Sequence, residues 1–127
     1  MVGLETGKDP LRETFTKNDR LLKRADFLRL SKSGKKVQNR QFIAYICKNE
    51  CGRCRLGLTV TRKVGNAAKR NRIKRLAREY FRKNRQILSE YFDISLIVKK
   101  ESVGLGNKAL VLALENIFAK IGKYQKD

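Results

Sequence analysis

The sequence of 127 residues contains no histidine and no tryptophan, one proline and only 12 acidic residues. Histidine is the commonest general base and metal ligand in proteins, so its absence excludes most serine-hydrolase and zinc-hydrolase mechanisms. A nuclease that works with two metal ions needs clustered carboxylates, whereas the acidic residues here stand singly, without an Asp-x-Asp pair. The sequence therefore predicts no catalytic residue and no metal ligand in the protein itself.

Cysteine is also scarce, and its three copies lie in one short segment, Cys47 followed by Cys51-Gly52-Arg53-Cys54. A thioredoxin-type site needs its CxxC at the start of a helix, whereas the residues after Cys54 have the pattern of a strand. A zinc site takes four ligands, and Glu50 would complete the three thiolates only awkwardly. We therefore interpret these cysteines as thiols of a turn with no part in a mechanism.

Long apolar runs are absent. None approaches the roughly 20 residues that span a bilayer, and the first residues, Met1 to Glu5, lack the basic segment and apolar core of a secretory signal. We therefore expect a cytoplasmic protein whose thiols stay reduced.

Positive charge is what the sequence has in excess. Lys and Arg number 31, which gives a formal net charge of +19. This charge is densest over residues 8–36 and 62–85 but is not confined to a tail. Cations at this density repel one another in a compact domain, and a polyanionic partner relieves that repulsion. Of the two usual partners, a membrane surface and nucleic acid, this distribution favours nucleic acid.

The length suits a single domain. Residues 1–17 are polar, include the only proline, Pro10, and show no sustained periodicity. We interpret them as a flexible basic arm, and residues 18–127 as one RNA-binding domain.

A short helix is expected over about residues 23–33, ended by Gly34 in a left-handed cap. Residues 37–48 alternate, with Phe42, Ala44 and Ile46 on one face and Ile43, Tyr45 and Cys47 on the other. Residues 55–62 repeat this alternation. The short interval from Asn49 to Arg53 predicts that the two runs pair as a hairpin, with an extra short strand near residues 35–37.

Helical spacing follows in the next segment, where one apolar stripe contains Ile73, Leu76, Ala77, Tyr80 and Phe81. Residues 91–99 alternate as a strand, and Gly104 and Gly106 precede a last helix. Its apolar positions are Leu110, Leu114, Ile117, Phe118 and Ile121. This order of elements predicts an α+β sandwich, with helices packed on one sheet.

The side of the central helix opposite its stripe is basic. At about 100° per residue, that face carries Asn71, Lys74, Arg75, Arg78 and Arg82. Arginine adds planar, bidentate hydrogen bonding to phosphate, and Gly65 and a helix cap at Asn66 would favour a close approach of RNA. The alternative is a solvated basic helix, but like charges such as Lys74 and Arg78 at i, i+4 disfavour it by a few tenths of a kcal/mol.

The segment from Lys63 to Arg78 resembles the RNR motif of the bacterial ribonuclease P protein family. That motif runs Lys-x-Gly-x-Ala-x-x-Arg-Asn-x-x-Lys-Arg-x-x-Arg, and its fixed positions are met by Lys63, Gly65, Ala67, Arg70, Asn71, Lys74, Arg75 and Arg78. Also similar to the family are Arg20-Leu21, Asp26-Phe27, Asn39-Arg40-Gln41-Phe42 and Arg55-Leu56-Gly57-Leu58. The resemblance extends over about residues 18–124.

The resemblance implies a two-layer α+β sandwich with a mostly antiparallel sheet, in the order αβββαβα, of the fold named after the second domain of ribosomal protein S5. It also implies a left-handed β-α-β crossover around the basic helix, where general packing rules favour the right-handed one. Function is implied as well: the family protein is the non-catalytic subunit of the endoribonuclease ribonuclease P. In that ribonucleoprotein a catalytic RNA holds Mg²⁺ and removes the 5′ leader from precursor tRNA. The protein binds this RNA and the leader, raises the affinity for substrate and magnesium, and binds no cofactor alone.

By resemblance, the motif residues would contact the catalytic RNA, namely Arg62, Lys63, Gly65, Asn66, Lys69, Arg70, Asn71, Arg72, Lys74, Arg75 and Arg78. Further RNA contacts are expected at Arg20, Asn39 and Arg40. The leader would lie between the first helix and the sheet, in a cleft lined by Phe27, Tyr45, Thr59 and Tyr124.

The residues give this cleft some support of their own. In the expected hairpin, Tyr45 lies beside Gly57 and Thr59, which leaves its ring free to stack on a base. The alternative is that Tyr45 and Phe27 pack together as core. Many relatives carry a second aromatic one helical turn beyond the Asp-Phe pair, where this chain has Ser31, so leader contacts there are expected to differ.

Two other functions remain open. A structural RNA-binding protein, such as a ribosomal protein of similar fold, explains the charge but not the spacing of the motif, and predicts RNA binding without an effect on tRNA maturation. An RNA chaperone or weak DNA-binding module predicts little selectivity and strong salt sensitivity.

Overall fold

The computed structural model of the chain describes residues 20, 24–50, 52–88 and 90–124, without the side chains of residues 87 and 124. The expected arm, residues 1–17, lies outside this part. The described elements are α1 (Arg24–Ser33), β1 (Lys35–Gln38), β2 (Phe42–Lys48), β3 (Arg55–Val60), η2 (Arg62–Val64), α2 (Ala67–Asn84), η3 (Arg85–Ile87), β4 (Phe92–Val98), η4 (Lys100–Ser102) and α3 (Asn107–Tyr124). Their order, αβββαβα, confirms the prediction, including the extra strand β1.

The four strands form one mixed sheet in the order β1-β2-β4-β3. β2 pairs antiparallel with both β1 and β4, whereas β3 pairs parallel with β4. The predicted hairpin between β2 and β3 is therefore wrong, because β4 lies between them. β4 is buried on both faces, as expected for an inner strand that helices cover on either side. The parallel β3-β4 pair needs a long connection, which α2 supplies; for this β-α-β unit the resemblance implies the left-handed crossover.

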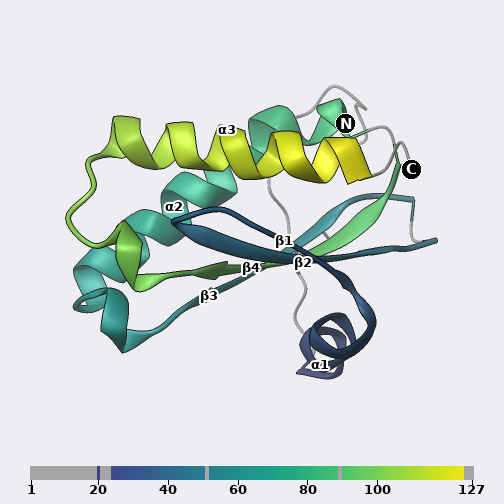
Figure 1. Cartoon of the computed structure of the whole chain (residues 1–127), viewed down its shortest axis with the longest axis horizontal. Coiled ribbons are helices and arrows are strands. Elements are labelled where there is room, and N and C mark those ends of the chain that lie inside the picture. The colour runs from purple at the N-terminus through teal and green to yellow at the C-terminus, as the bar shows by residue number, and fades with distance from the viewer. Residues whose placement is uncertain (1–19, 21–23, 51, 89, 125–127) are drawn as a thin grey trace, which may run out of the picture.

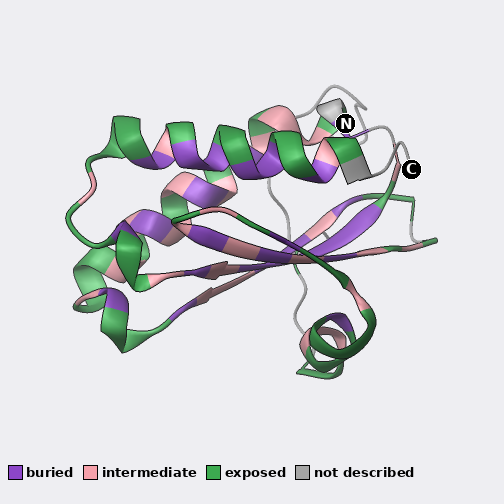
Figure 2. Cartoon of the chain, in the orientation of Figure 1, coloured by how far each residue is buried: buried purple, intermediate pink, exposed green. Residues whose placement is uncertain are grey.

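The helices lie on both sides of the sheet. Figure 1 shows α2 and α3 together on one face and α1 on the other. The alternation along β2 explains the first layer, because Phe42, Ala44 and Ile46 are buried towards α2 and α3 while the residues between them are half-buried. Figure 2 shows the buried sides of α2 and α3 turned towards the sheet and towards each other.

The stripe predicted along α2 forms the centre of this core. Ile73, Ala77 and Phe81 are buried, and Leu76 and Tyr80 pack against them. Phe118 of α3 meets the rings of Tyr80 and Phe81 edge to face, at centroid distances of 5.1 and 6.2 Å. The basic side of α2 is therefore turned away from the core. None of the described helices is long and apolar enough to cross a membrane.

Gly34 follows the last residue of α1, but it does not form the predicted left-handed cap, because its φ is not positive. Its N–H donates to the carbonyl of Leu30 at 2.9 Å. A Cβ at this position would lie 2.6 Å from that carbonyl oxygen and 3.0 Å from the carbonyl oxygen of Ile46. Glycine is needed here because two backbone segments approach closely, not because of its freedom in φ.

Candidate nucleic-acid interface

The basic face of α2 forms one wall of an open groove of about 420 Å³, lined by Arg20, Asn71, Lys74, Arg75, Arg78, Glu79 and Arg82. Four of these cations lie on α2, at spacings that bring them to one side of the helix. Arg20 comes from outside the helix and reaches the groove because its backbone forms a bridge with Leu56 of β3. The face predicted from the sequence is thus confirmed as a surface, and Arg20 extends it.

Five cations and one carboxylate line the groove. Burial, and then repulsion from Arg20, lower the pKa of Arg78. The carboxylate in the groove, Glu79, accepts a hydrogen bond from Nε of Arg82 at 2.6 Å and forms an ion pair with the same side chain. Arg82 is therefore partly neutralised. Lys74, Arg75 and Arg78 line the same groove.

The N-terminus of α2 is organised by the motif itself. Asn66 caps the helix, and its Oδ1 accepts from the N–H of Lys69 at 3.0 Å, as predicted. Gly65 has a φ of 151°, a backbone conformation that side chains disfavour. Nε of Arg70 donates to the carbonyl of Gly65 at 3.2 Å. The predicted RNA ligands Asn66 and Arg70 therefore also shape the loop that precedes the helix.

Two other predicted RNA ligands are engaged within the protein. Arg72 donates to the carbonyl of Leu105 at 2.9 Å and bonds the side chain of Asn107, which ties α2 to the start of α3. The Nδ2 of Asn39 donates to the carbonyl of Ala113 at 2.9 Å, so Asn39 ties the β1-β2 turn to α3. The remaining predicted contacts Arg62, Lys63, Lys69 and Arg40 are exposed.

The second predicted surface lies on the face of the sheet that α1 partly covers. In register across the strands, Lys36 of β1 lies opposite Tyr45, Tyr45 opposite Ser95 of β4, and Ser95 opposite Gly57 of β3. The direct neighbour of Tyr45 is therefore Ser95, not Gly57 as the expected hairpin implied. On the β4 side the neighbours in this row, Ser95 and Gly57, are small all the same, and Tyr45 is half-buried.

The other expected cleft residues are placed on three elements. Phe27 is half-buried on α1, which contacts β2 and β4. Thr59 pairs with Ile97, one row along the sheet from Tyr45, on the same face. Tyr124 ends α3, which lies in the layer on the other face (Figure 1), and its side chain is outside the described residues.

One polar cluster was missed by the sequence analysis. Asp93 of β4 is fully buried and bonds Arg29 of α1, Arg55 of β3 and Asn49; these four residues are here called the Asp93 cluster. Burial alone would raise the pKa of Asp93, but hydrogen bonds from Arg55, Arg29 and Asn49 lower it below its ordinary value. The available signal was a single carboxylate in the mostly apolar strand Phe92–Val98.

Neither cysteine with a described position forms a disulfide: Cys47 is half-buried and Cys54 is buried. A strand begins directly after Cys54, as expected. In the described part of the chain, no three Cys, Asp or Glu side chains are grouped so that they could hold a metal ion.

Known proteins share both the sequence and the fold. The family described as Ribonuclease P matches residues 15–122. A ribonuclease P protein component of Desulforapulum autotrophicum is 48% identical over 108 residues, which are 85% of this chain and 92% of that protein. The RNase P protein of Staphylococcus aureus has a TM-score of 0.77 at 36% identity, over 81% of this chain and 94% of that one. The RNase P protein of Thermotoga maritima has a TM-score of 0.72 at 36% identity, over 80% and 96%. This chain therefore belongs to the ribonuclease P protein family, the protein components of an endoribonuclease of tRNA 5′ processing.

Proposed function

We propose that this chain is the non-catalytic subunit of ribonuclease P and binds the RNA subunit through the α2 groove. The proposal rests on the groove, because Lys74, Arg75 and Arg78 of α2 line it together with Arg20. RNA phosphates relieve the repulsion within such a group and accept paired hydrogen bonds from guanidinium groups. Asn71, a neutral donor and acceptor among the cations, adds a group able to bond a base or a ribose hydroxyl.

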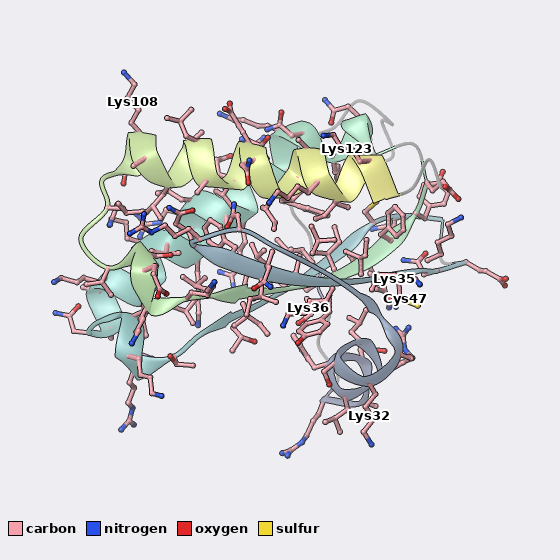
Figure 3. All side chains as sticks on the ribbon, in the orientation of Figure 1. Lys32, Lys35, Lys36, Cys47, Lys108 and Lys123 are labelled. Atoms are coloured by element: carbon pink, nitrogen blue, oxygen red, sulfur yellow. The ribbon has the colours of Figure 1, made fainter. Side chains whose placement is uncertain are left out.

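We also propose that the 5′ leader of precursor tRNA binds between α1 and the sheet, against Tyr45. The row of Tyr45, Ser95 and Gly57 supports this, because small neighbours leave the face of the ring accessible to a base. Cations border the same region: Lys32 on α1 and Lys36 on β1 are exposed, and Figure 3 shows both side chains in the part of the molecule around α1. Their ammonium groups are suited to the leader phosphates.

In this proposal the magnesium ions bind to the RNA and not to the protein. A surface as basic as the groove repels a free divalent cation, so a protein of this charge raises magnesium affinity by arranging RNA phosphates. We propose that the RNA holds the ions and supplies the chemistry. The protein would supply binding energy and position the leader.

The groove assignment is tested by a pair of variants on one helix. Lys74→Ala removes a lining cation, and Lys83→Ala removes an exposed cation of α2 outside the groove. We expect Lys74→Ala to weaken the complex with ribonuclease P RNA by about fivefold and to reduce the salt slope of binding by about 1. Lys83→Ala should change affinity by less than about twofold. Equal losses would mean that net charge alone matters and would contradict the assignment.

The leader assignment is tested in the holoenzyme with Tyr45→Ala, and Tyr45→Phe as the variant that keeps the ring. Loss of the stacking platform should weaken binding of leader-bearing precursor by about 1–3 kcal/mol and leave binding of mature tRNA unchanged. Tyr45→Phe should bind both as the wild type does. Equal effects on precursor and mature tRNA would rule the cleft out.

A further inference from the structure

The Asp93 cluster joins three elements through one carboxylate. Oδ1 of Asp93 accepts from Nε of Arg55 at 2.7 Å and from Nδ2 of Asn49 at 2.8 Å. Oδ2 accepts from Nη2 of Arg55 and from Nη2 of Arg29, both at 2.7 Å. These four hydrogen bonds occupy the four lone-pair sites of the carboxylate.

Charge compensation does not explain why two arginines are present. A buried carboxylate needs one well-placed cation, and Arg55 supplies it from the neighbouring strand with a two-point contact. Arg29, whose side chain is 40% exposed, adds a second positive charge at the edge of a site whose carboxylate Arg55 already neutralises. A different role for Arg29 follows from its position: it lies on α1 and connects this helix to Asp93 of the sheet.

Little else holds α1 against the sheet. Of its ten residues, only Leu30 is buried. The hydrogen bonds of Ser31 and Ser33 stay within the helix, as does the ion pair of Arg29 with Asp26 at 3.6 Å. Among the described residues, the contact of Arg29 with Asp93 is the side-chain hydrogen bond that joins α1 to the sheet. Figure 1 shows α1 without another helix beside it on that face.

The contact lies next to the proposed leader cleft. Asp93 is opposite Cys47, and Ser95, two residues along β4, is opposite Tyr45. Two residues of a strand span about 7 Å, so the point where α1 is fixed is one row from the ring. Phe27 lies on the same helix, two residues before Arg29.

We propose that Arg29 is a positioning residue, which through Asp93 fixes α1 at the distance and orientation at which the cleft binds the leader. This inference rests on the proposed leader cleft. Arg29 acts through Asp93 and not as a leader ligand, so its removal loosens α1 even in the protein alone.

The first test is hydrogen exchange of the full chain without RNA. Arg29→Ala leaves Asp93 paired with Arg55 and Asn49, so the sheet stays intact. We expect exchange of the α1 amides to rise about fivefold, the loss of roughly one modest interaction, with no change in α2. Arg24→Ala removes the same charge from an exposed position of α1 and should leave exchange as in the wild type. Unchanged α1 exchange in Arg29→Ala would overturn the proposal, even if RNA binding weakens.

The second test measures the ratio of affinities for precursor and mature tRNA in the holoenzyme. Arg29→Ala should lower this ratio about fivefold with cleavage at saturation unchanged, Arg29→Lys should restore part of it, and Arg24→Ala should keep it. If Tyr45→Ala lowers the ratio but Arg29→Ala does not, the positioning role is refuted while the cleft stands. If neither lowers it, the leader cleft itself is wrong, and the positioning role falls with it.

Discussion

Replacing Asn39 by alanine is expected to destabilise the fold by about 2 kcal/mol. Each hydrogen-bonding group of this side chain is used within the protein. Nδ2 donates to the carbonyl of Ala113 at 2.9 Å and to Oδ1 of Asn116 at 3.0 Å. Oδ1 accepts from the N–H groups of Gln41 at 3.0 Å and Phe42 at 2.8 Å. No donor or acceptor of the side chain is left over for RNA.

The magnitude follows from these contacts. Three of the four hydrogen bonds are part-buried, and each is worth about 0.5–1.5 kcal/mol net. The bond to Asn116 is exposed and adds little. Water reaches the partly exposed turn and replaces some of the lost bonds, which brings the sum towards the lower part of its range.

Urea denaturation followed by circular dichroism measures this loss, and the RNA affinity of the folded variant is measured beside it. Arg40→Ala is the matched control, because the neighbouring side chain in the same turn is exposed. Arg40→Ala should stay within about 0.5 kcal/mol of wild-type stability and weaken RNA binding. Asn39→Ala should lower the stability by about 2 kcal/mol and leave the RNA affinity of the folded protein unchanged. Wild-type stability with lost RNA affinity in Asn39→Ala would refute this reasoning and make Asn39 a direct RNA ligand.

Three further predictions concern single side chains. Because the pKa of Asp93 lies below its ordinary value of 3.8, its contribution to stability is complete above that pH and is lost as the pH falls through the lowered pKa. Asp93→Asn should remove this part of the acid destabilisation in urea titrations carried out below about pH 4. Asn66→Ala removes the cap of α2 and should cost about 1 kcal/mol in the same assay, whereas a cost near zero would mean that the cap contributes nothing. Arg75→Ala should reduce the salt slope of binding to ribonuclease P RNA by about 1, and an unchanged slope would show that Arg75 touches no phosphate.

The parts of the fold that the sequence predicted are those that depend on neighbours along the chain. The stripe from Ile73 to Phe81 and the cap at Asn66 follow from helical spacing and local hydrogen bonding, and both are confirmed. The outward cations of α2 follow from the same periodicity. The α2 side of the groove was therefore predicted. The place of Arg20 in the groove was not, since it depends on the bridge between Arg20 and Leu56.

The parts that failed depend on contacts between distant segments. β2 and β3 are separated by few residues and both alternate, which favoured a hairpin, but alternation does not reveal which strand lies beside which. The apolar strand β4 takes the position between them. The same limit applies to Asp93, whose partner Arg29 is 64 residues away along the chain. It applies in part to Gly34, where the carbonyl of Ile46, from a distant segment, lies close in addition to that of Leu30.

The most direct test of the proposed function is cleavage of precursor tRNA by a bacterial ribonuclease P RNA at low magnesium, with and without this protein. The account predicts cleavage at the mature 5′ end that depends on the protein, and none with the protein alone. RNA binding of normal affinity without any stimulation, in buffers where the RNA is folded, would contradict it and indicate a structural RNA-binding protein.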